Sequence, residues 1–140
     1  MKFKYRKINL PVQSDFLGKS IFKPIIPIKI YRSDAFLQYA ALLDSGADFC
    51  IFDAEIGEYL GLNIKNGTEI QFGGIQNLGG AKAYVHKVGI EIGGHRFDAD
   101  VAFSFDIAKH GYGILGQKGF FDAFQVQFDL KKETVELKPR

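Results

Sequence analysis

The sequence predicts an all-β fold with one or two short helices. Its 140 residues include 16 Gly and four Pro, so the chain has many points at which it can turn sharply. Runs rich in β-branched and aromatic side chains separate these points, and such runs are typical of strands. The length and the hydrophobic fraction of 46% fit one compact domain over residues 1–140, because two domains would each bury too little apolar surface.

The first half of the chain contains two clear strand patterns. Residues 21–32 are β-like, but Pro24 and Pro27 cannot donate to a strand ladder, which predicts an edge or irregular strand. Residues 36–43 form a second apolar strand, which ends abruptly at Asp44.

The middle of the chain combines a short helix with a glycine-rich segment. The apolar run at residues 49–52 precedes Asp53, which we expect to cap a helix that runs through Leu60 and stops at Gly61. A strand at residues 69–72 then leads into the segment 73–80, which has a glycine pair at each end.

The second half contains the strongest hairpin signal. Gly93-Gly94 lies between strand patterns at residues 85–92 and 95–103. Gly113-Ile114-Leu115-Gly116 is a further apolar stretch that ends in glycine. Three elements complete the prediction: a helical segment at residues 118–124 and strands at residues 125–130 and 134–138.

The charge balance and the apolar runs argue against several classes of protein. A net charge of +2, from 18 basic and 16 acidic residues, does not indicate a nucleic-acid partner. No apolar run approaches the ~20 residues of a membrane span, and residues 1–10 lack the apolar core of a signal peptide. Cys50 is the single cysteine, so we expect a cytoplasmic protein without a membrane partner. The basic residues near the N-terminus alternate with aromatic ones and indicate the polar face of a strand; they are Lys2, Lys4, Arg6 and Lys7.

Asp44-Ser45-Gly46 is the main candidate for chemistry. Asp44 follows an apolar strand directly, so the turn projects its carboxylate at the end of that strand. Ser45 can donate or accept a hydrogen bond within the turn, and Gly46 permits close backbone approach. Two carboxyl groups that share a proton can hydrolyse a peptide bond, because one deprotonates water while the other protonates the carbonyl. The chain has one Asp-Ser/Thr-Gly, so the second carboxyl has to come from a second copy across a two-fold axis.

Other candidate sites have simpler interpretations. Cys50 and the histidines suggest a cysteine nucleophile, but Cys50 lies in an apolar run and is interpreted as a core thiol. His86, His95 and His110 lack close ligand spacing, so we expect no metal and no other cofactor. The glycine pairs of residues 73–80 lack the Lys-Ser/Thr and the helix start of a phosphate-binding loop. Three aspartates alternate with apolar residues and indicate a solvated strand face: Asp98, Asp100 and Asp106.

Residues 42–47 resemble the Asp-Thr/Ser-Gly-Ala signature of the retropepsin-like aspartic proteases, both the retroviral enzymes and their single-domain bacterial relatives. Ile114-Leu115-Gly116 is similar to the family's second landmark, which threads beside the catalytic loop. Phe72-Gly73-Gly74-Ile75 resembles the glycine-rich flap and lies between these two landmarks. Residues 23–28 resemble the strand that precedes the catalytic strand in bacterial members. Residues 1–20 are an N-terminal extension for which the family offers no counterpart.

This resemblance implies a closed retropepsin-like acid-protease barrel that is active as a homodimer. Asp44 is then the catalytic carboxylate, and the hydroxyl of Ser45 interlocks the two catalytic loops of the dimer. Gly46 and Ala47 contact the substrate, with the Gly46 carbonyl facing the substrate backbone. Asp48 binds the peptide main chain or braces the dimer. Three flap residues close over the substrate as a hairpin: Gly73, Gly74 and Ile75.

The expected function is therefore that of an aspartic endopeptidase, which hydrolyses peptide or protein substrates without a metal. The Phe and Ile content near the flap predicts apolar pocket walls. Two alternatives remain from other classes of protein. One is a non-catalytic peptide-binding or dimerisation module on the same fold, and the other is a structural β domain of a larger assembly.

Overall fold

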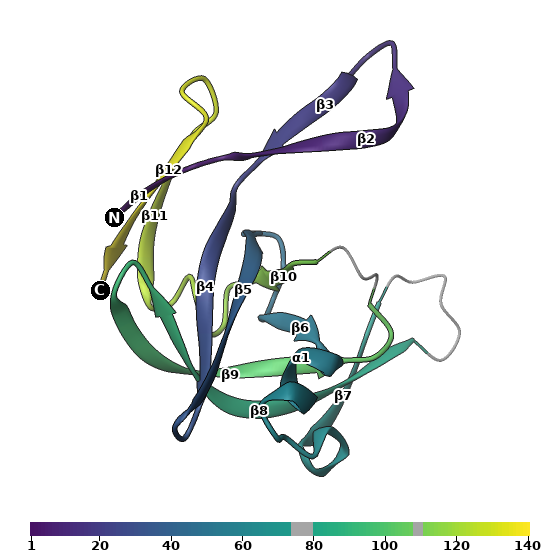
Figure 1. The fold of residues 1–140 in the computed structure, drawn as a ribbon, viewed down its shortest axis with the longest axis vertical. Coiled ribbons are helices and arrows are strands. Elements are labelled where there is room, and N and C mark those ends of the chain that lie inside the picture. The colour runs from purple at the N-terminus through teal and green to yellow at the C-terminus, as the bar shows by residue number, and fades with distance from the viewer. Residues whose placement is uncertain (74–79, 108–110) are drawn as a thin grey trace.

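A computed structural model describes residues 1–73, 80–107 and 111–140 of the chain (Figure 1). These residues form twelve strands, one α-helix and one 3-10 turn, η1 (Ile64–Asn66). No helix in the described ranges is long and apolar enough to cross a membrane. In chain order, the other elements are β1 (Lys2–Lys4), β2 (Arg6–Ser14), β3 (Gly18–Lys23), β4 (Ile25–Arg32), β5 (Ala35–Leu43), β6 (Ile51–Asp53), α1 (Ala54–Tyr59), β7 (Thr68–Phe72), β8 (Ala81–Ile92), β9 (His95–Ser104), β10 (Gly113–Leu115), β11 (Phe124–Asp129) and β12 (Thr134–Pro139).

Six of the strands form a closed barrel. Their order is β4-β5-β10-β6-β9-β8, and pairing between β4 and β8 closes the ring. β7 adds to the other side of β8 as a seventh strand. Closure satisfies the backbone groups that an open sheet would leave exposed at its edges. The closed β barrel expected from the sequence is confirmed.

The two prolines of the first strand pattern have different consequences. Pro24 lies between β3 and β4, so the predicted segment 21–32 is split into two strands. Pro27 lies inside β4 opposite Ala40, and β4 meets its second partner, β8, only from Lys29 onward. Pro27 is therefore at a position with one neighbouring strand, as expected for a residue that cannot donate to a ladder.

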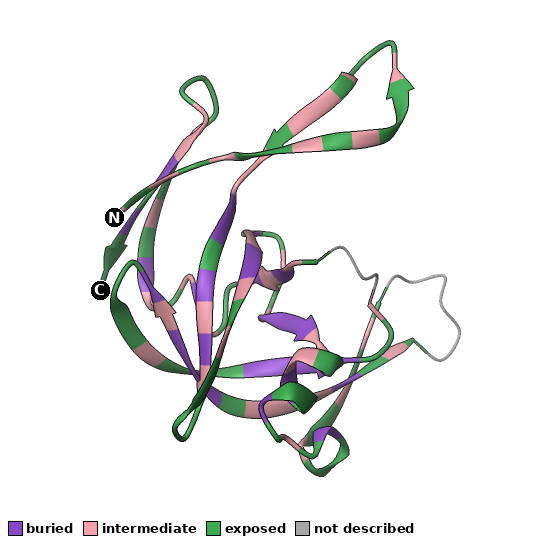
Figure 2. Ribbon diagram, in the orientation of Figure 1, coloured by how far each residue is buried: buried purple, intermediate pink, exposed green. Residues whose placement is uncertain are grey.

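Aromatic rings fill the centre of the barrel, where Figure 2 shows the buried strand segments facing one another. Phe52 and Phe103 are fully buried and meet edge to face, with ring centroids 6.0 Å apart. Phe120 and Phe124 are also fully buried and stack at 5.1 Å, which joins the C-terminal strands to the same core. Such aromatic pairs stabilise a core beyond the area that they bury.

Most of the caps and turns predicted from short sequence patterns are present in the structure. Asp53 caps α1 by accepting a hydrogen bond from Glu55 N, and Gly61 follows the helix with a φ of +82°. Gly93 and Gly94, at φ +55° and +83°, join β8 to β9 as the predicted hairpin. β8 starts at Ala81, earlier than the predicted residue 85.

The predicted helical segment at residues 118–124 is wrong, because these residues form consecutive turns that lead into β11. Gly119 has a φ of +102°, a backbone angle that no right-handed helix contains. Phe121 N donates to Gly116 O and Asp122 N donates to Gln117 O, so these bonds span five residues rather than four.

The chain ends form a small sheet beside the barrel, in the order β1-β12-β11 (Figure 1). Met1 N donates to Leu137 O at 2.9 Å, and Leu137 N donates back to Met1 O at 2.7 Å. Lys2 and Lys4 are exposed while Phe3 is half-buried, which confirms the polar strand face. β2 and β3 form a separate two-stranded sheet, the N-terminal hairpin.

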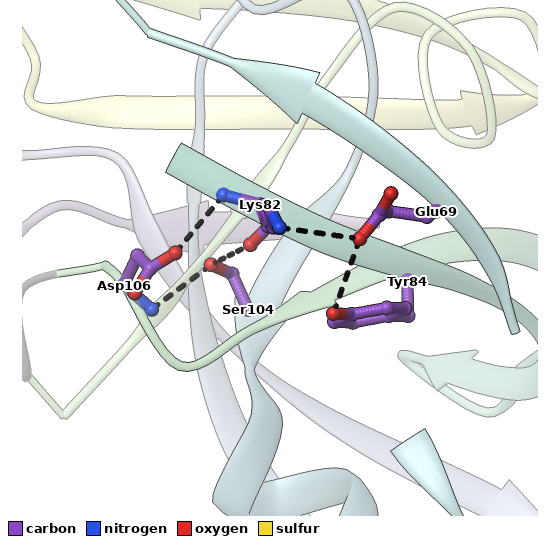
Figure 3. Close-up of polar contacts among 5 residues, drawn as sticks. All are labelled: Glu69, Lys82, Tyr84, Ser104 and Asp106. Atoms are coloured by element: carbon purple, nitrogen blue, oxygen red, sulfur yellow. Dashed lines mark hydrogen bonds and ion pairs between the residues drawn. The ribbon is translucent and has the colours of Figure 1, made fainter. Parts of the chain in front are cut away.

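A polar clamp fixes the start of β8, close to the glycine-rich segment (Figure 3). Tyr84 is paired with Phe103, but β9 ends at Ser104, so on this side β9 does not continue opposite Lys82, which pairs with Gln71 of β7 on its other side. Side chains bond the backbone groups of Lys82 in place of a strand. The buried Ser104 hydroxyl donates to Lys82 O at 2.6 Å, and the Asp106 carboxylate accepts from Lys82 N at 2.9 Å. The Ser104 hydroxyl also accepts from Asp106 N at 3.0 Å.

We predict that Ser104→Ala destabilises the protein by about 1–3 kcal/mol, because Lys82 O loses a donor and Asp106 N loses an acceptor. Urea unfolding measures this difference. Ser20→Ala, at a half-buried serine of β3, is the matched control and should change stability by less than about 0.5 kcal/mol. Equal stability of the two variants would contradict the role given to the clamp.

Candidate active site

Asp44 is the first residue after β5, and three backbone hydrogen bonds fix its position. Asp44 N donates to Leu115 O at 3.0 Å, which ties the residue to the end of β10. Gly46 N donates to Asp44 Oδ1 at 3.0 Å, so the turn itself orients the carboxylate. Ala47 N donates to Asp44 O at 3.1 Å and closes the turn. The carboxylate is thus held by the main chain rather than by neighbouring side chains.

The loop at residues 44–50 wraps around the end of β10. β10 lies between β5, to which it is parallel, and β6, to which it is antiparallel, so the two strands that flank the loop in sequence also flank β10 in space. Gln117 N donates to Ala47 O at 2.8 Å, and Lys118 N donates to Asp48 O at 3.0 Å. The two segments that resemble family landmarks in the sequence are therefore hydrogen-bonded to each other.

Gln117 is a site residue that the sequence did not reveal. Its side-chain Nε2 donates to Ser45 O at 2.8 Å, so it braces the exposed part of the Asp44 turn. Its position directly after Ile114-Leu115-Gly116 was the available signal, because a residue there leaves β10 beside the Asp44 turn.

Gly116 is required by the close approach of the two segments. A Cβ at this position would overlap Phe49 O and lie 2.8 Å from Ala47 O. Both obstacles are backbone atoms, which cannot rotate away as a side chain can. The glycine that ends the apolar stretch 113–116 is thus explained by crowding rather than by turn geometry.

The residues of the Asp44 turn face outward. Ser45, Gly46 and Asp48 are exposed, whereas Asp44 and Ala47 are half-buried. A carboxylate that is fixed by the backbone and still accessible can accept a proton from water or donate one to a ligand.

The described part of the glycine-rich segment lies near this loop. Gly73 is exposed, directly follows β7 and has a φ of +130°, whereas Gly74 and Ile75 lie outside the described residues. Phe72 meets Phe49 edge to face, with ring centroids 6.2 Å apart, so the end of β7 touches the loop that starts at Asp44.

An apolar hollow of about 220 Å³ lies beside this aromatic contact. Its lining comes from the loop, from β7 to β9 and from the segment after β10: Phe49, Ile70, Val85, Asp100, Ala102 and Lys118. The hollow exposes almost only apolar surface.

Cys50 is a core residue rather than a nucleophile. It is fully buried, and this burial raises the pKa of its thiol to about 11. Its Sγ accepts from Gly116 N at 3.4 Å and donates to Lys118 O at 3.6 Å, so the thiol joins the two interlocked segments.

The described residues form none of the other catalytic or metal sites considered from the sequence. His86 Nε2 lies 2.7 Å from Ile64 O, and His95 packs against Phe97 and Phe124. His110 is outside the described residues. Among the residues that are described, no three metal-ligating side chains come together. The predicted solvated aspartates Asp98, Asp100 and Asp106 are all exposed.

A comparison with solved structures shows that this architecture is known. The chain is similar to the crystal structure of a retropepsin-like aspartic protease from Rickettsia conorii, with a TM-score of 0.58 and 16% sequence identity, over 96% of this chain and 95% of that chain. A second similar structure is EIAV protease complexed with the inhibitor HBY-793, with a TM-score of 0.44 and 24% identity over 68% of this chain and 82% of that one. No protein-family model matches the chain, and no curated protein matches it in sequence. The chain therefore has the retropepsin-like fold that its sequence predicted.

We predict that Gly116→Ala destabilises the fold by at least about 1–3 kcal/mol, because the new methyl group overlaps backbone atoms of the loop. Thermal or urea unfolding measures the loss. Gly46→Ala is the matched control, since a Cβ there meets only Asp44 Oδ1, at 3.3 Å. If the two variants were equally stable, crowding at Gly116 would not be the reason for the glycine.

We predict that Cys50 resists thiol-specific reagents in the native protein and reacts fully in denaturant. With a pKa of about 11, its thiolate fraction at pH 8 is about 10⁻³, and burial blocks access as well. Mass spectrometry after labelling in both conditions measures the difference. Native labelling at the rate of a free thiol would contradict the assignment of Cys50 to the core.

Proposed function

We propose that the protein is an aspartic endopeptidase whose active site forms when two copies bring their Asp44 carboxyls together. The observation that carries this proposal is the loop geometry: Asp44 is bound to Leu115 O through its backbone and to Gly46 N through its carboxylate. This loop occurs in a barrel that resembles a retropepsin-like aspartic protease along nearly the whole chain.

The chemistry requires two carboxyls in different protonation states. The ionised Asp44 removes a proton from a water molecule, and the resulting hydroxide attacks the carbonyl carbon of the scissile peptide bond. The protonated Asp44 of the other copy donates its proton to the carbonyl oxygen, which gives a neutral tetrahedral intermediate. The Asp44 that took the proton from water then gives it to the amide nitrogen, while the other Asp44 carboxylate takes a proton from a hydroxyl of the intermediate. The C–N bond breaks, and one of the two carboxyls is protonated again.

A single copy supplies only half of this site. The sequence contains one Asp-Ser/Thr-Gly, and its turn is exposed, so a two-fold axis beside Asp44 can place two identical turns against each other. The chain 1–140 acts in this proposal as one domain per copy. The single buried Cys50 is compatible with the cytoplasm as its location.

The neighbouring residues of the turn take supporting roles. The exposed Ser45 contacts the same residue of the other copy, while Gln117 holds the Ser45 carbonyl. Gly46, Ala47 and Asp48 bind the main chain of an extended peptide.

The glycine-rich segment covers the substrate in this proposal. Gly73, Gly74 and Ile75 bind the far side of the peptide through strand-like hydrogen bonds. The apolar hollow lined by Phe49 and Ile70 receives an apolar side chain of the peptide, because it offers few polar partners.

We predict that Asp44→Asn lowers kcat/KM for an extended peptide by at least about 10³-fold, because the amide can no longer exchange protons with water. A library of fluorogenic peptides measures this loss, and circular dichroism checks that the fold is retained. Asp98→Asn, an exposed aspartate on β9, is the matched control and should keep the wild-type activity. Cleavage by the purified Asp44→Asn protein at the wild-type rate would rule out the proposed mechanism.

A further inference from the structure

We propose that the N-terminal hairpin, β2 and β3, is an arm that packs across the second copy of the chain. This inference rests on the proposed homodimer and adds to it, because the barrel and the Asp44 loop do not by themselves indicate what the hairpin contacts.

The hairpin has an apolar face that the rest of the described chain leaves largely uncovered. β2 and β3 form a sheet of their own, and the main neighbour of each strand is the other strand. Ile8 and Leu10 alternate with the exposed Lys7 and Asn9, and Ile8 lies opposite Ile21. Such alternation is typical of a strand with one buried face, but no second layer of sheet or helix lies over this one in Figure 1.

The end of the hairpin carries the most exposed apolar side chains of its two strands and turn. Phe16 is 93% exposed, Val12 78% and Leu17 49%. An isolated two-stranded hairpin is marginally stable in water, and contiguous exposed apolar side chains mark interaction surfaces. We therefore expect another protein surface to cover the apolar side chains of the hairpin.

The base of the hairpin lies beside the proposed dimer axis. Pro24 follows β3 directly, and its carbonyl accepts a hydrogen bond from Leu43 N at 3.0 Å. Leu43 is the residue before Asp44. A second copy that brings its own Asp44 alongside must therefore approach the base of this hairpin, which identifies the second copy as the occupant of its apolar face.

The length of the hairpin also favours the second copy. Eight residue steps separate Phe16 from Pro24, and at about 3.3 Å a step they span about 26 Å. A compact chain of 140 residues has a radius of gyration of about 14 Å. Figure 1 shows the hairpin extending away from the barrel, so its tip reaches well past its own barrel, and in the proposed dimer we place it over the second copy.

Sedimentation equilibrium over a range of concentrations tests the arm. The triple substitution Val12→Ser, Phe16→Ser and Leu17→Ser should raise the dissociation constant of the homodimer by about tenfold or more, because it removes three apolar contacts. All three residues are exposed in the single chain, so its melting temperature at low concentration should not change. Tyr59→Ser and Leu130→Ser remove equally exposed apolar side chains outside the hairpin and should leave dimerisation unchanged.

If the triple substitution leaves the dissociation constant of the homodimer unchanged, the role proposed for the hairpin is wrong, but the proposed protease function is not contradicted. A wild-type protein that stays monomeric at every concentration overturns both proposals. A dimer that the triple substitution weakens supports the arm even if no peptide is cleaved.

Hydrogen exchange of the wild-type protein gives a check without mutations. Amides of residues 6–23 should become more protected as the concentration rises through the dimerisation range. Protection that does not change with concentration contradicts the arm.

Discussion

The insertion of β10 between β5 and β6 is the constraint on which the rest of this structure depends. It brings Leu115 O within 3.0 Å of Asp44 N and forces the chain from residue 44 to residue 50 to pass around the end of β10. The surrounding residues follow from this crowding. Gly116 leaves room for backbone atoms, and the buried thiol of Cys50 bonds to the main chain on the other side. Both residues therefore contact the segments that position Asp44, although neither is proposed to touch a substrate.

Under the proposed function, a single copy of the chain is incomplete as a catalyst. The loop presents an accessible carboxylate that the backbone holds in place, but aspartic-protease chemistry needs two carboxyls with different protonation states. In the proposed homodimer, the second copy supplies the second carboxyl by symmetry, without a second motif in the chain. The base of the N-terminal hairpin lies next to Asp44, so the arm proposed for association leaves the barrel at the end that carries this carboxylate.

The sequence by itself determined the elements whose causes are local. The cap at Asp53, the turn at Gly93-Gly94 and the edge position of Pro27 each depend on the backbone preferences of one or two residues. The placement of Asp44 at a strand end was equally local, because it required only an apolar strand followed by a turn tripeptide. The closed barrel followed from resemblance to a family rather than from strand patterns.

Only the tertiary structure decided how distant segments meet. Residues 118–124 have a helix-like sequence, but they form turns in which Gly119 has a φ of +102°, and the preceding N–H groups of Gln117 and Lys118 bond to the Asp44 loop. The bond from Gln117 to Ser45 joins residues 72 positions apart, and the clamp from Ser104 to Lys82 depends on where β9 ends. The N-terminal hairpin is a further example: the alternation of its residues indicates a strand with one apolar face, whereas the place of its base next to Asp44 is given by the bond from Leu43 N to Pro24 O. Local backbone preferences determined where the caps, turns and strands lie along the sequence. Long-range hydrogen bonds determined which residues come together at the candidate active site.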